Sequence, residues 1–175
     1  MDLNGEYRIA APREVVWAAL NDPEVLRQCI PGCETLEQRS PTEMAARVRL
    51  KVGPISAAFN GAVMLENINA PESYTIAGQG QGGAAGFAKG RADVRLAEDG
   101  PEATILTYTA KADVGGKLAT LGGRLITATS QKLADEFFGK LVKVVSGEDA
   151  AGSDGAPAPD GEKKKGFWKK WLGRG

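Results

Sequence analysis

Apolar side chains recur at every second position through the middle of the chain, from about residue 33 to about residue 113. In the clearest run they alternate with Arg47, Arg49 and Lys51. A period of two is typical of a β-strand with one buried and one solvated face. Similar runs follow, separated by turns rich in Gly and Pro, so we expect an antiparallel meander of about five or six strands. The apolar members of the clearest run are Met44, Ala46, Val48, Leu50 and Val52.

Two short helices are expected before this meander. A strand over residues 5–10 precedes Pro12, which stands where a first helical residue is favoured, and apolar residues continue at helical spacing to Leu20. The order Asn21-Asp22-Pro23 then provides a helix cap followed by a proline in the first turn. The second helix is predicted to stop at Pro31-Gly32, a pair that favours a turn.

A long helix is predicted from about Lys117 to Ser146, where leucine, phenylalanine and valine recur at helical spacing. Gly122-Gly123 interrupts this stretch at about 1 kcal/mol per glycine relative to alanine, so the helix should start late or bend there. A strand, two short helices, a meander and one long helix together indicate an α+β domain. In such a domain the last helix packs across the concave face of the sheet.

The segment from Gly78 to Gly83 matches the G-x-G-x-x-G pattern of dinucleotide-binding loops. Those loops join a parallel strand to a helix, whereas the residues after Gly83 include two more glycines and then alternate as a strand. We therefore expect a hairpin here and no nucleotide site. Gly78, Gly80 and Gly82 would share one face of a strand, and on the inward face they would leave a cavity between sheet and helix. The alternative is a strand with plain bulges and close packing.

The chain contains no histidine, which excludes Ser-His-Asp triads, Cys-His pairs and histidine metal sites. Cys29 and Cys33 are too few for a zinc ligand set, and we expect both to be buried free thiols. The remaining titratable candidates form no recognisable acid–base pair by spacing. We therefore predict no catalytic residue, no metal site and a protein that is not itself an enzyme. The titratable candidates are Glu66, Tyr74, Asp93, Tyr108 and Asp113.

Residues 147–162 contain five acids and no base, and they lack leucine, isoleucine, valine, methionine and aromatic residues. Such a composition buries too little apolar surface to order itself, so we predict a disordered acidic linker. The folded domain should then comprise residues 1–146, which is enough chain for one core. Removing the five acids of the linker and the six bases that follow from the totals of 22 and 22 leaves this domain with 17 acids and 16 bases.

Residues 163–175 carry those six bases, no acid and two of the three tryptophans. On a helical projection the aromatic residues fall on one side and Lys169 and Lys170 on the other. This combination is typical of a short amphipathic segment at an anionic membrane surface. A purely solubilising tail would need no aromatic residues, and the slightly acidic domain disfavours nucleic acid as the partner. The predicted membrane-binding residues are Lys163, Lys164, Lys165, Phe167, Trp168, Lys169, Lys170, Trp171, Leu172 and Arg174.

No apolar run is long enough for a membrane-spanning helix, and the N-terminal residues do not form a secretory signal. We therefore expect a cytoplasmic protein that is held peripherally at the inner face of the cytoplasmic membrane.

The order of elements resembles the START-like (SRPBCC) helix-grip superfamily, whose members wrap an antiparallel sheet on a long C-terminal helix and hold apolar ligands between the two. Four motifs in order make the resemblance to the carbon monoxide dehydrogenase CoxG family more specific, and they span most of residues 1–146. These motifs are Asn21 to Leu26 closing on Cys29 to Glu34, Lys51 to Ile55, Val114 to Ala119 with Leu121-Gly122, and Phe137-Phe138.

The resemblance implies an accessory protein of aerobic CO oxidation that recruits a molybdenum CO dehydrogenase, or a related hydroxylase, to the membrane. It also implies that the cavity binds an isoprenoid quinone, menaquinone or ubiquinone, as electron acceptor. Three alternatives remain: a docking adaptor without ligand, a carrier of another hydrophobic small molecule, and a cyclase or hydrolase with a titratable group inside the cavity. The expected cavity residues are Trp17, Leu26, Ile30, Phe59, Met64, Gly78, Gly80, Gly82, Phe87, Leu118, Leu121 and Phe138.

Overall fold

The computed structural model describes residues 1–146, and the predicted linker (147–162) and tail (163–175) lie outside them. Seven antiparallel strands form one sheet in the order β1-β7-β6-β5-β4-β3-β2. The elements are β1 (Asp2–Ile9), α1 (Arg13–Leu20), α2 (Pro23–Cys29), β2 (Cys33–Ser40), β3 (Glu43–Val52), β4 (Ile55–Asn69), β5 (Ser73–Gln81), η1 (Gly83–Ala85), β6 (Phe87–Glu98), β7 (Thr104–Gly115), η2 (Gly116–Leu121) and α3 (Gly123–Ser146).

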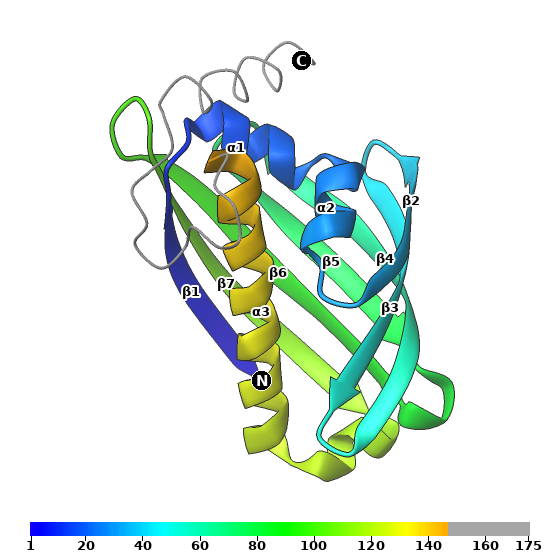
Figure 1. Cartoon of the computed structure of the whole chain (residues 1–175). Helices are drawn as coiled ribbons and strands as arrows, with labels where there is room; N and C mark the ends of the chain where they lie inside the picture. Colours follow the sequence, from blue (N-terminus) through cyan, green and yellow to red (C-terminus); the bar gives the residue numbers. More distant parts are fainter. Residues whose placement is uncertain (147–175) are drawn as a thin grey trace.

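The sheet curves around α3, which runs along its inner face from the end at the β3–β4 hairpin to the end at α1 (Figure 1). Helices α1 and α2 lie over the same face, and the opposite face of the sheet carries no helix in the described part of the chain. This arrangement is the predicted α+β helix-grip fold. The six strands β2 to β7 form the meander, and β1 pairs with β7 at its end.

The alternation along the strands sorts side chains onto two faces. On β3 and β4, the buried residues Met44, Val52, Phe59 and Leu65 point inward, whereas Arg47 between them is exposed on the outer face. Because successive side chains of a strand point to opposite faces, one period-two pattern determines which residues pack against α3.

The start of α2 follows the sequence signal. The Asp22 carboxylate accepts the backbone N–H of Glu24 at 2.9 Å, and Pro23 is the first helical residue, where its missing N–H is not needed. The prediction for α1 was one residue early. Pro12 has an extended backbone and caps the helix, which begins at Arg13, because the Pro12 carbonyl already accepts from Val15 and Val16.

The double glycine delays the long helix, as its sequence predicts. Residues 116–121 form the 3-10 helix η2, and α3 begins only at Gly123. Gly122 has φ +88°, a conformation that glycine adopts without strain and that lets the chain change direction between the two helices. The helix then runs without interruption to Ser146.

The core consists of two apolar clusters at opposite ends of the sheet. The larger packs α1 and the C-terminal half of α3 onto β1, β6 and β7, and Ile9, Leu106 and Leu141 are fully buried in it. The smaller lies where α3 begins and contains Val52, Phe59, Ala85, Leu118 and Ile126.

Polar and aromatic contacts fasten α3 to the β1–β7 side of the sheet. The Tyr7 hydroxyl donates to the Asp135 carboxylate at 2.5 Å, and the Gln131 amide donates to the Tyr108 hydroxyl at 3.4 Å. The Tyr7 ring stacks on Phe138, with 4.6 Å between ring centroids. Burial, and then the hydrogen bond to Asp135, raise the pKa of Tyr7. The helix is therefore held firmly against β1 and β7.

Candidate functional site: an apolar cavity between the sheet and the long helix

A cavity of about 350 Å³ lies between α3 and the inner face of β3 to β7. Its volume falls near the lower end of the roughly 300–1,000 Å³ that is typical of small-molecule sites. The walls are almost entirely apolar, as in most sites for uncharged ligands. The lining residues are Ile30, Pro31, Val48, Leu50, Val52, Phe59, Gly61, Gly80, Ala88, Val114, Leu118, Ile126, Thr129, Ser130 and Leu133.

A row of small residues across five strands explains the space. Ala46 pairs with Gly61, Gly61 with Gly80, Gly80 with Ala88, and Ala88 with Val114. A Cβ atom on Gly80 would find no neighbour closer than 3.9 Å. Because interiors are otherwise packed to crystal density, a row without bulky side chains leaves volume that the helix does not fill.

Two hydroxyls stand out in this apolar wall. Thr129 and Ser130 of α3 are the polar side chains among the lining residues of the described chain. Neither hydroxyl has a hydrogen-bond partner within residues 1–146. A buried hydroxyl without a partner is unfavourable, so a ligand that offers one hydrogen-bonding group here would gain both affinity and a fixed orientation.

A smaller recess of about 210 Å³ adjoins the cavity beneath the Pro31-Gly32 turn. It shares Pro31, Leu50, Thr129 and Leu133 with the cavity and is otherwise lined by polar and charged residues of β3 and α3. The cavity therefore approaches the surface between β3 and α3. The remaining lining residues of the recess are Gly32, Arg49, Lys51, Lys132 and Glu136.

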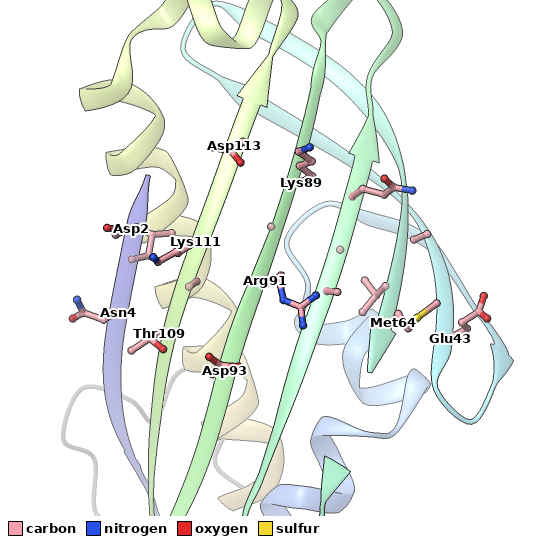
Figure 2. A pocket seen from close by; sticks show the side chains of 18 residues that line it. Asp2, Asn4, Glu43, Met64, Lys89, Arg91, Asp93, Thr109, Lys111 and Asp113 are labelled. Carbon is pink, nitrogen blue, oxygen red and sulfur yellow. The ribbon is translucent and has the colours of Figure 1, made fainter. Parts of the chain in front are cut away.

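A second and larger hollow, of about 850 Å³, lies on the outer face of the sheet (Figure 2). Charged side chains of both signs project into it from β1, β3, β6 and β7, and Arg91 is paired with Glu66 at its margin. This mixture suits a solvated sheet face better than a site for an apolar molecule. The charged residues labelled there are Asp2, Glu43, Lys89, Arg91, Asp93, Lys111 and Asp113.

Four of the residues predicted for the cavity line it in the structure: Ile30, Phe59, Gly80 and Leu118. Gly78 and Gly82 lie beside them but do not line the cavity; a Cβ on Gly82 would clash with the Phe59 ring.

Four further predicted residues pack in the interior away from the cavity. Trp17 meets Tyr74 edge to face with 5.1 Å between ring centroids, and Phe138 lies between Tyr7 and Tyr108. Leu26 is buried on α2, and Leu121 packs against the smaller core cluster. These residues belong to the ordinary core, because the larger cluster, and not the cavity, fills the space beneath α1 and the end of α3.

The predictions for Met64 and Phe87 were wrong. Met64 is 44% exposed and lines the outer hollow, because its neighbours Val63 and Leu65 occupy the inward positions of β4. Phe87 is 42% exposed and covers Gly115 on the outer face, since it is the first residue of β6 and has the same orientation as Lys89.

The sequence interpretation missed the part of α3 that lines the cavity. Ile126, Thr129, Ser130 and Leu133 follow helical spacing and form one face once the helix begins at Gly123. That spacing was a usable signal. On the strands, Val48 and Leu50 were recognised as inward residues but were not assigned to a cavity, because only the register places them beside the small-residue row.

The titratable groups near this site are few. Cys29 and Cys33 are both free; Cys29 is buried as predicted, whereas Cys33 is half-buried, because it begins the edge strand β2. Burial raises the pKa of the Cys29 thiol to about 11 and raises that of Cys33 as well. Within residues 1–146 no group of three potential ligands is placed to hold a metal ion, and no helix is long and apolar enough to cross a bilayer.

The fold is shared with several solved structures. A conserved protein from Geobacillus kaustophilus is 31% identical, with a TM-score of 0.77 over 82% of this chain and 93% of that one. The Zhui aromatase/cyclase from Streptomyces is 15% identical, with a TM-score of 0.61 over 87% and 98%. A START superfamily protein from Mycobacterium smegmatis is 18% identical, with a TM-score of 0.56 over 80% and 96%. No curated protein matched the chain.

The match to a family model covers nearly all of the described chain. Residues 5–146 match the model of CoxG, a component of carbon monoxide dehydrogenase. This range contains the cavity, both short helices and the whole of α3. The protein therefore belongs to the carbon monoxide dehydrogenase CoxG family, and its fold is that of the START-like proteins.

Proposed function

We propose that this protein is a non-catalytic accessory protein that carries an isoprenoid quinone for a molybdenum CO dehydrogenase, or a related hydroxylase, at the cytoplasmic membrane. The quinone, menaquinone or ubiquinone, would sit with its head group in the apolar cavity and accept electrons there. The tail, residues 163–175, would hold the protein reversibly at the inner leaflet, and the linker would let the domain meet the dehydrogenase.

The lining of the cavity carries this proposal. It combines an apolar wall with two unpartnered hydroxyls, Thr129 and Ser130, and has no ionisable side chain among its described residues. A quinone head group is flat, uncharged and bears carbonyl oxygens that accept hydrogen bonds from such hydroxyls. A charged ligand would lose its hydration without gaining a partner, and this disfavours fatty acids and nucleotides inside the cavity.

The cavity volume limits how much of such a ligand can be enclosed. About 350 Å³ is enough for a head group and the start of an isoprenoid chain, but not for a long chain. The remainder would leave through the recess between β3 and α3. A partly enclosed ligand suits a carrier that must exchange its cargo with a bilayer.

The same lining argues for a carrier over an enzyme. The Zhui protein is an aromatase/cyclase, so helix-grip folds can host catalysis. General acid–base chemistry, however, needs a titratable group that reaches the substrate. The described lining offers only the hydroxyls of Thr129 and Ser130. Carriage of a different neutral, hydrophobic small molecule is the second candidate, and the unpartnered hydroxyls favour it over a docking adaptor with no ligand.

The test is mass spectrometry of an organic extract of the full-length protein, purified without detergent from a quinone-containing host. We expect a stoichiometric isoprenoid quinone. The matched variants are Gly80→Leu, which places a side chain in the cavity, and Gln79→Leu, which adds the same side chain on the outer face of the same strand. Quinone should be lost from the first variant alone. A wild-type extract without any apolar molecule would support the adaptor instead.

A further inference from the structure

The two ends of the domain differ in charge. The end at which α3 begins is built from residues 50–59, 80–88 and 114–128, which include the β3–β4 hairpin, η1 and η2 (Figure 1). These segments carry three cations, Lys51, Lys117 and Arg124, and no acid. At the far end, the segments 66–74 and 97–104 carry five acids and no base: Glu66, Glu72, Glu98, Asp99 and Glu102.

The three cations are free to bind an external partner. Lys51, Lys117 and Arg124 are all exposed, and none forms an ion pair within the described residues. At the far end, in contrast, Arg8 and Arg13 are already paired with acids, at 2.8 Å to Asp99 and 3.5 Å to Glu98. The positive charge at the α3 start is therefore not neutralised by the protein itself.

Apolar groups accompany these cations. Phe87 is 42% exposed, and Pro54 and Ala119 are exposed at the turns beside it. We call Lys51, Lys117 and Arg124, together with Pro54, Phe87 and Ala119, the basic end. Cations around small apolar protrusions fit the interface of an anionic bilayer, where the charges meet lipid phosphates and the apolar groups enter between head groups.

The cavity lies at this same end. Val52, Leu118 and Ile126 belong both to its lining and to the elements that form the basic end. A surface that met the bilayer here would bring the cavity close to the phase in which an apolar ligand dissolves.

We propose that the basic end docks on the anionic leaflet, so that the cavity end of the domain, and not its acidic far end, faces the membrane. This inference rests on the membrane recruitment in the proposed function and adds an orientation to it. The acidic far end then points into the aqueous phase, away from the lipid phosphates, because like charges repel across a Debye length of about 8 Å.

The length of chain beyond the domain permits this orientation. Helix α3 has 24 residues, so Ser146 lies about 36 Å from the basic end. The sixteen residues 147–162 can reach at most about 53–58 Å when fully extended. The tail can therefore reach the same leaflet that the basic end touches.

The experiment is amide hydrogen exchange of the full-length protein with phosphatidylglycerol–phosphatidylcholine vesicles, combined with flotation of the same vesicles. We expect slower exchange of residues 53–55 and 116–124 when the vesicles are added, and no change in residues 98–103. Each base near an anionic leaflet raises partitioning about fivefold, so reversal of three bases should abolish this protection. Vesicles of phosphatidylcholine alone should give no protection.

Two variants with the same change in net charge separate orientation from simple attraction. The first is Lys51→Glu/Lys117→Glu/Arg124→Glu, at the basic end. The second is Arg39→Glu/Arg95→Glu/Lys140→Glu, in which three exposed bases without ion pairs are reversed elsewhere. We expect only the first to lose the protection, while both still float through the tail and keep wild-type circular dichroism.

Each other outcome overturns the orientation. If the wild type floats without protection at the basic end, or if both variants lose protection equally, the docking surface is wrong while recruitment by the tail stands. If the wild type does not float with anionic vesicles, recruitment and orientation both fail. Protection by the purified dehydrogenase in place of vesicles would instead assign the basic end to a protein partner.

Discussion

The backbone N–H of Arg49 donates to the carbonyl of Gly32 at 2.9 Å, and this bond ties the turn after α2 to strand β3 beside the cavity. Gly32 has φ +73°, and a Cβ atom there would clash with the Arg49 carbonyl oxygen. Two requirements, a left-handed backbone and a close approach, therefore coincide at one residue. The turn that bounds the cavity thus depends on glycine.

Gly32→Ala should lower the free energy of unfolding by more than about 2 kcal/mol, since strained backbone alone costs about 1–3 kcal/mol and the clash adds to it. Gly100→Ala is the matched control, because Gly100 has φ +85° but no atom within 4 Å of the added Cβ. It should lose only the conformational part, about 1–2 kcal/mol. Urea titrations of both variants measure the difference, and equal losses would contradict the close approach.

Thr129→Val should weaken binding of a short-chain quinone about two- to tenfold, because a hydrogen bond contributes about 0.5–1.5 kcal/mol while the shape of the wall is preserved. Thr127→Val, two residues away on α3 and outside the lining, should leave the affinity unchanged. Isothermal titration calorimetry provides both values. An unchanged affinity for Thr129→Val would show that this hydroxyl does not contact the ligand.

Cys29 should make stability fall between about pH 9 and pH 11. Burial favours the neutral thiol, so the pKa rises from 9.0 in the unfolded chain to about 11 in the folded protein. Below pH 9 the thiol is protonated in both states and its contribution is complete; above this pH the unfolded state loses its proton first, and stability declines. Stability curves against pH should be flatter for Cys29→Ala than for wild type in this window. Parallel curves would contradict the raised pKa.

Trp168→Ala/Trp171→Ala should abolish flotation with anionic liposomes, because the proposed tail needs aromatic insertion in addition to its lysines. Circular dichroism and the midpoint of thermal unfolding should stay at wild-type values, since both residues lie outside the domain matched by the family model. Undiminished flotation of this variant would argue against the tail as the membrane-binding segment.

The outward position of Met64 could have been found in the sequence, whereas that of Phe87 could not. Val63 and Leu65 flank Met64 and carry the inward alternation of β4, so period two alone turns Met64 outward. Phe87 follows the η1 turn, where the period restarts, and its face depends on pairing with Gln81 and Gly115. Local pattern assigns a face only inside a strand that has already been established.

The sequence by itself determined the elements and their order, because helix caps, turn residues and the two hydrophobic periods act over neighbouring residues. Asp22, Pro23 and Gly122 show this, since each sets a helix boundary through its own backbone or side chain. Only the tertiary structure decided where the cavity lies. Gly61, Gly80 and Ala88 come from three strands, and strand register alone brings them opposite Thr129 of α3. Such a void is set by side chains distant in sequence, so no local pattern can specify it.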